Sequence, residues 1–188
     1  MTGLQIEVPT IPPVEVTGNH CGRIAAQIIG TRTGPEAKPR EKIMPEYIPS
    51  PSDWVREQVE LYESSGGTKG LTLRDTGLPV IIVTNTGRNS GAIRKTPLMR
   101  VADGDNYVLV ASKGGAPKHP VWYYNLKAES NVQIQDATEK YDMRVREVYD
   151  PTEKARLWVL AVAAYPPYQD YQDKAGRAIP VFIAEPIS

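Results

Sequence analysis

The chain has 188 residues, with 22 basic and 22 acidic side chains, so its formal net charge is zero. This balance gives no electrostatic basis for nucleic-acid binding over a broad basic face, and the length suits one domain with a substantial buried core. Cys21 is the only cysteine, and His20 and His119 are the only histidines. These counts exclude an intramolecular disulfide and a cysteine-built zinc site, and they argue against a histidine metal site or a catalytic triad. We expect neither a metal nor a nucleic acid.

Residues 1–43 are rich in proline, glycine, threonine and charge, without a sustained hydrophobic period. This composition predicts a disordered or extension segment, followed by a folded domain over residues 44–188. Met44 is then a candidate natural start. The N-terminus lacks the basic start and apolar core of a secretory signal, and no apolar stretch is long enough to span a bilayer. We therefore expect a cytoplasmic protein.

A helix is predicted from Ser52 or Asp53 to about Glu63, with glycines at 66 and 67 ending it. Val55, Val59 and Tyr62 lie at helical spacing and form an apolar face. The favoured interpretation is packing on the domain. A surface that covers a ligand or contacts the inner face of the cell membrane is the alternative, although the glutamates of the polar face match anionic lipid poorly.

Three apolar runs follow, separated by turn-rich linkers, which is typical of consecutive antiparallel strands. They are Val80–Val83, Leu98–Val101 and Tyr107–Ala111. Pro120 then suits the first turn of a helix that continues from Val121 to Ala128.

Alternating apolar and polar residues predict two further strands, over 132–135 and 141–146. Asp150-Pro151 begins a helix whose buried face contains Leu157, Leu160, Ala161 and Ala164. A loop over residues 168–172 leads to a last strand, Ile179–Ala184. Short connections between mostly antiparallel strands favour a small β-barrel of about six strands with peripheral helices.

Two linkers combine glycines, hydroxyls and cationic side chains: Thr86–Gly91 and Ser112–Lys118. The first linker is not a dinucleotide fingerprint, because it leads into another strand rather than a helix. Glycines let backbone donors approach a ligand, and Arg88, Ser90 and Arg94 are suited to hold phosphate or carboxylate oxygens. A polar hairpin with a solvated arginine is the simpler alternative, which the second such linker makes weaker. The sequence predicts a site for an anionic ligand.

Two aromatic segments remain ambiguous from the residues alone. Trp122–Asn125 suits either helix packing or ligand contact, with Asn125 able to turn a polar tip inward. Tyr165, Tyr168 and Tyr171 recur every three residues beside prolines. Such phenols usually cover a core edge, but they also stack on planar ligands or donate to a developing oxyanion.

Three blocks together resemble the deazaflavin-dependent nitroreductase family of actinobacteria: TNTGRNSGAIRKTPL, ASKGGAPKHPVWYYNL and AYPPYQDYQ with RAIPVFIAEP. The resemblance covers roughly residues 44–188 and implies a split β-barrel that binds the deazaflavin coenzyme F420. It further implies an oxidoreductase that passes a hydride from reduced F420 to a quinone, a nitro compound or another electron-poor acceptor. Proteins of this barrel class often form homodimers, so the resemblance also implies a homodimer.

The resemblance assigns two sets of residues. The cofactor-binding set is Arg88, Asn89, Ser90, Arg94, Lys95, Thr96, Pro97, Leu98, Val110, Ala111, Ser112, Lys113, Val121, Trp122, Tyr123, Tyr124, Asn125 and Tyr168. The catalytic set, at the substrate side and the ring, is Ser112, Tyr165, Tyr168 and Tyr171.

The chain departs from the family pattern at two positions. Asn89 stands where the glycine loop often has a lysine, and Met99 stands where the nitroimidazole-reducing member has a tyrosine. Three alternatives stay open: an FMN-dependent oxidoreductase on the same barrel, a non-catalytic F420 carrier, and a membrane-docked interaction module built on the 54–62 helix.

Overall fold

The computed structural model describes residues 45–187, so the predictions for residues 1–43 and for Met44 lie outside the described part of the chain. Four α-helices, two 3-10 helices and seven strands make up the described residues. In chain order they are α1 Asp53–Ser64, η1 Arg74–Thr76, β1 Val80–Thr86, β2 Ile93–Met99, β3 Ala102–Asp103, β4 Asn106–Val110, η2 Lys113–Gly115, α2 Val121–Ala128, β5 Asn131–Asp136, β6 Glu139–Glu147, α3 Pro151–Ala164, α4 Pro167–Ala175 and β7 Val181–Pro186.

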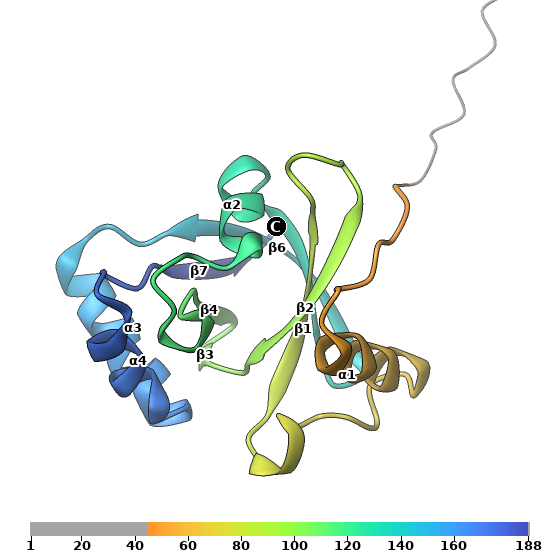
Figure 1. Cartoon of the computed structure of the whole chain (residues 1–188), viewed down its shortest axis with the longest axis horizontal. Helices are drawn as coiled ribbons and strands as arrows, with labels where there is room; N and C mark the ends of the chain where they lie inside the picture. Colours follow the sequence, from red (N-terminus) through yellow and green to blue (C-terminus); the bar gives the residue numbers. More distant parts are fainter. Residues whose placement is uncertain (1–44, 188) are drawn as a thin grey trace, which may run out of the picture. The chain divides into compact units, whose positions relative to one another are not determined.

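All seven strands form one antiparallel sheet in the order β2-β1-β5-β6-β7-β4-β3. β2, at one edge, also contacts β4 near the other edge, so the sheet curls into a split barrel (Figure 1). The predicted fold class is confirmed. The seventh strand is the two-residue β3, which is too short to give a period in the sequence.

The core consists of two clusters that share β1. Val80 and Ile82 belong to one cluster, while Ile81 and Val83 belong to the other, because successive side chains of a strand point to opposite faces. Helices α1, α3 and α4 contribute buried residues to the first cluster, and α2 contributes Trp122 and Leu126 to the second. β1 is therefore buried on both faces, which explains its continuous apolar run.

Helix α1 packs on the sheet through the predicted face. Val55, Val59 and Tyr62 are all buried, and the Tyr62 hydroxyl accepts a 2.7 Å hydrogen bond from the Ala137 backbone. The packing interpretation of this helix is confirmed, and membrane contact stays a prediction. No helix of residues 45–187 combines the length and hydropathy needed to cross a bilayer.

Two predicted elements were wrong in extent or type. The second strand begins at Ile93 rather than Leu98, because Ile93–Met99 pairs residue by residue with β1 although its first half is polar. The predicted loop over 168–172 lies inside α4, with Pro167 at its first position and Gly176, at φ +62°, ending it. The mostly polar composition of this segment gave no apolar helical pattern, and packing of its tyrosine side chains stabilises the helix.

A third difference concerns α2: Pro120 is its N-cap rather than a first-turn residue.

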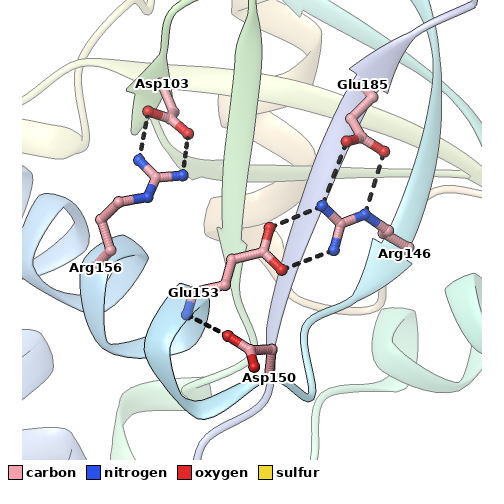
Figure 2. A network of polar contacts seen from close by, with 6 residues as sticks. All are labelled: Asp103, Arg146, Asp150, Glu153, Arg156 and Glu185. Atoms are coloured by element: carbon pink, nitrogen blue, oxygen red, sulfur yellow. Dashed lines mark hydrogen bonds and ion pairs between the residues drawn. The ribbon is translucent and has the colours of Figure 1, made fainter.

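Charged groups fasten the start of α3 to the sheet (Figure 2). The Asp150 side chain accepts a 2.7 Å hydrogen bond from the Glu153 backbone, as the predicted cap requires. Arg146 on β6 donates to both Glu153 oxygens, at 2.9 and 2.7 Å, and also pairs with Glu185. Arg156 makes a two-pronged pair with Asp103 on β3. These contacts set where α3, and therefore α4, lie against the sheet.

Replacing Glu153 by glutamine should lower the free energy of unfolding at pH 7 by roughly 0.5–1 kcal/mol, since the pair is partly exposed and screened. The Arg146 guanidinium holds the pKa of the Glu153 carboxyl below its ordinary value. A pKa lower in the folded state stabilises the fold above the unfolded value of about 4.3, and this is lost as pH falls through the folded pKa. Urea unfolding at pH 7 and pH 3 should therefore show that the difference in free energy of unfolding between wild type and Glu153→Gln is smaller at pH 3. The control is Glu57→Gln on the exposed face of α1. An equal difference at both pH values, or an equal loss of stability in the control, would contradict the role of the Arg146–Glu153 pair.

Candidate active site

Two cavities meet on one side of the sheet. The first, of about 780 Å³, is lined mainly by apolar and aromatic side chains from α1, β2, β4, α2 and the α3–α4 region, and we call it the apolar cavity. The second, of about 700 Å³, is lined by the Thr86–Gly91 loop, β2, α2 and the segment before α1, and we call it the cationic cavity. Ser50, Thr96, Val121 and Trp122 line both, so the two form one cleft with a neck at these residues.

The glycine loop of the cationic cavity is a closed turn between β1 and β2. The Gly87 backbone donates to Ala92, and the Gly91 backbone donates to Gly87, each at 2.8 Å. Gly91 has φ +67°, and a Cβ on Gly87 would lie 2.8 Å from the Ser90 hydroxyl. Gly91 is therefore required by the turn that presents Arg88, Asn89 and Ser90 to the cavity, whereas a side chain at Gly87 would first meet the Ser90 hydroxyl, which can move aside.

Asn125 supports this loop from α2. Its side-chain oxygen accepts from the Arg88 backbone at 3.1 Å, and its side-chain nitrogen donates to the buried Asn85 oxygen at 2.8 Å. Asn125 is only 3% exposed. Its polar tip does turn inward, as the sequence suggested, but both ends are used to hold the loop.

Replacing Asn125 by alanine should destabilise the fold by about 2–3 kcal/mol, because the Arg88 N–H and the Asn85 oxygen both lose their partner. The loop should also lose its fixed position, so binding of an anion there should weaken. Urea unfolding and ligand titration of the variant measure the two effects. The matched control is Asn131→Ala, an exposed asparagine on β5. Equal stability of the two variants would show that Asn125 does not support the loop.

The cationic side chains that line the cationic cavity differ in whether a carboxylate already neutralises their charge. Lys95 pairs with Glu63 at 2.6 Å and lies 4.8 Å from the Tyr47 ring, so its charge is already balanced. Arg88 lies 4.8 Å over the Tyr124 ring, and Arg94 donates to the Ile48 carbonyl at 3.2 Å. Neither arginine has a carboxylate partner among residues 45–187. Arg88 and Arg94 are the charges left for an anionic ligand.

The second glycine linker is explained partly by packing. Lys113, Gly114 and Gly115 all have positive φ, between +49° and +75°. A Cβ on Gly115 would lie 3.1 Å from the Tyr171 carbonyl oxygen, so this glycine allows the linker to approach α4. Ser112 is buried, and it lines the apolar cavity together with Lys113.

The three predicted tyrosines form one cluster in the wall of the apolar cavity. The Tyr165 and Tyr171 hydroxyls lie 3.2 Å apart, and the Tyr168 ring packs edge-on against both neighbours. Burial and the hydrogen bond with Tyr171 raise the pKa of Tyr165 to about 12. Burial also raises the pKa of Tyr168, which is 5% exposed. Tyr165 and Tyr168 are therefore protonated near neutral pH and able to donate hydrogen bonds.

The structure brings nearly all the predicted site residues to this cleft. The exceptions are Ala111, which is fully buried, and Tyr123, which packs on Phe182 and His119; neither lines either cavity. Met99 is buried in the wall of the apolar cavity. Ser50, Trp54 and Arg74 are among the lining residues that the sequence analysis did not assign to the site. Of these three, only Trp54 had a signal, since the helix pattern placed it beside the apolar face.

A split barrel with a cleft that is cationic at one end and apolar at the other defines a class of protein that binds an anionic, partly planar cofactor. Residues 54–186 match the family model described as F420H(2)-dependent quinone reductase, and the chain belongs to this family. It is therefore an oxidoreductase whose cofactor is coenzyme F420, and the FMN alternative finds no support. The family resemblance that the sequence indicated is confirmed.

Individual relatives support the same family assignment. An F420H(2)-dependent quinone reductase of Mycobacterium tuberculosis is 37% identical over 132 residues, which is 69% of this chain and 87% of that protein. A solved structure titled F420-H2 dependent reductase is 50% identical, covers 57% of this chain and 94% of that one, and has a TM-score of 0.54. Another, described as a domain-swapped dimer, is 49% identical, covers 72% and 100%, and has a TM-score of 0.56.

Proposed function

We propose that this protein reduces a quinone with a hydride from reduced F420, and that the cofactor occupies the neck and the cationic cavity while the quinone enters the apolar cavity. The observation that carries the proposal is the division of the cleft. Free arginines lie at one end, and protonated tyrosines lie at the other.

The residues present fit F420. Its phosphate and glutamate tail need cations, which Arg88 and Arg94 supply through charge-assisted hydrogen bonds. The Gly87–Gly91 turn adds backbone donors close to the same cavity. Asn89 in place of a lysine removes one cation from this loop, so more of the attraction depends on the two arginines.

The neck suits a planar ring. Val121 is 74% exposed there although it is apolar, and Trp122 lies beside it on α2. Covering Val121 with a flat ring removes apolar surface from water and contributes roughly 25 cal/mol per Å². Thr96 on β2 also lines the neck, and Pro97 next to it lines the apolar cavity.

Bound reduced F420 supplies the hydride, so the chain itself needs to orient, exclude water and stabilise charge. Tyr168 and Ser112 are placed to donate hydrogen bonds toward the quinone oxygen on which negative charge builds, and Tyr165 and Tyr171 hold each other beside them. Hydride transfer leaves a hydroquinone monoanion, which takes one proton from solvent to complete the reduction.

Oxidation of reduced F420 by menadione, followed by absorbance with and without the protein, tests this proposal. We expect turnover that depends on both enzyme and quinone and is not supported by reduced FMN. Tight F420 binding with no oxidation by any quinone would favour the non-catalytic carrier instead.

Two further expectations, a homodimer and peripheral membrane contact, accompany this proposal. We propose a homodimer, supported by the relative described as a domain-swapped dimer, and light scattering of the purified protein tests it. Peripheral membrane contact would use Trp54 and Leu61, which are exposed on α1. Sedimentation with anionic lipid vesicles tests it, and a protein that stays in the supernatant would exclude it.

A further inference from the structure

Arg74 is a cation at the apolar end of the cleft that the cofactor proposal does not use. It begins η1 and lines the apolar cavity but not the cationic cavity. Its guanidinium carbon lies 5.1 Å from the centre of the Trp54 ring, and Trp54 lines the same cavity while 38% exposed. The guanidinium lies over the indole ring, so the cavity wall presents a positive charge and an aromatic side chain together.

The backbone holds Arg74 in an uncommon conformation. Its φ is +46°, in the left-handed region that side chains other than glycine seldom adopt. Hydrogen bonds close the turn around it, from Thr76 to Leu73 at 3.0 Å and between Leu73 and Leu78 at 2.8 Å. A strained residue that its surroundings hold in place is a sign of a functional constraint.

The charges around the apolar cavity are all of one sign. Arg74 and Lys113 are the only charged side chains that line it among residues 45–187, and no carboxylate does. Lys113 lies in η2, which packs against α4, and it has no carboxylate partner within the described residues. Arg74 lies on the side of α1 and has no carboxylate partner within the described residues. Both cations are available to the acceptor, and Arg74 is the one that lies against an aromatic side chain of α1.

We propose that Trp54 and Arg74 determine acceptor specificity: they favour planar quinones that carry an anionic substituent, with the ring on the indole and the anion on the guanidinium. The inference depends on the proposed function for the identity of the reaction. An attraction of about 1–2 kcal/mol between partly solvated charges at contact distance corresponds to roughly tenfold in binding or in kcat/KM.

The test compares naphthoquinone sulfonate with neutral menadione as acceptors for F420-loaded enzyme. In Arg74→Gln the ratio of kcat/KM for the sulfonate over menadione should fall about tenfold from the wild-type ratio, and Arg74→Lys should restore most of it. Because the variant's ratio is divided by the wild-type ratio, the difference in reduction potential between the two quinones cancels. Lys69→Gln removes a nearby cation outside both cavities and should leave the ratio unchanged.

Calorimetric titration with naphthoquinone sulfonate provides a readout that needs no turnover. Its Kd should rise about tenfold in Arg74→Gln and severalfold in Trp54→Ala. An unchanged ratio and an unchanged Kd in Arg74→Gln would overturn the inference while leaving the reductase intact. Oxidation by neither quinone, with the Kd still dependent on Arg74, would instead reject the proposed reaction and retain the binding surface.

Discussion

Replacing Arg88 and Arg94 together by alanine is expected to weaken F420 binding by at least about 100-fold, since charge-assisted hydrogen bonds to anions contribute roughly 1.5–3 kcal/mol each. They are the cationic-cavity side chains whose charge is not already balanced, because Lys95 pairs with Glu63. Titration of F420 absorbance or fluorescence with the variant measures the loss. Binding by wild type should also weaken as salt rises, and binding by the variant should depend less on salt.

Arg144→Ala is the matched control, because Arg144 is an exposed arginine on β6 that lines neither cavity. The double variant should unfold at nearly the wild-type urea concentration, since both arginines make only minor contacts with the protein. If the double variant binds F420 as tightly as Arg144→Ala does, the cationic cavity is not the site of the phosphate and tail.

Replacing Tyr168 by phenylalanine should lower kcat for quinone reduction by about 100-fold, in line with the loss of one donor to a developing oxyanion. The Tyr168 ring is buried against Tyr165 and Tyr171 and should pack equally well as phenylalanine. F420 affinity should therefore stay within a few fold of wild type. Single-turnover oxidation of bound reduced F420 separates this effect from substrate binding.

The control is Tyr141→Phe, which removes an exposed hydroxyl on β6 away from the cleft. A kcat for Tyr168→Phe equal to that of Tyr141→Phe would show that the Tyr168 hydroxyl takes no part in the reaction. Tyr171→Phe should have an intermediate effect, because it only removes the partner of Tyr165.

The sequence predicted the elements whose hydrophobic pattern matches their burial. β1, α2 and the capped start of α3 fall where the pattern placed them, because each has a continuous apolar face or a recognised cap. β2 and α4 were misjudged, since pairing with β1 and tyrosine packing stabilise them despite polar composition. Local propensity does not contain those long-range contacts.

The sequence predicted the candidate site only in part. Arg88, Arg94 and the tyrosines belong to short blocks that the family resemblance identifies. The support of the glycine loop by Asn125 depends on a partner 37 residues away along the chain. Arg74 gave no signal, because only the folded chain brings its turn to the cavity wall. Sequence patterns identified many of the residues that line the cleft, but not the contacts that hold them in place.

The account's central claim is that one cleft holds F420 across its neck and cationic cavity and leaves the apolar cavity for the acceptor. A crystal structure of the complex with F420 tests this most directly. We predict the phosphate and tail beside Arg88 and Arg94, and the deazaflavin ring on Val121 with one face toward Tyr168. A ring that fills the apolar cavity as far as Trp54 and Arg74 would leave no room for a quinone and would contradict the account.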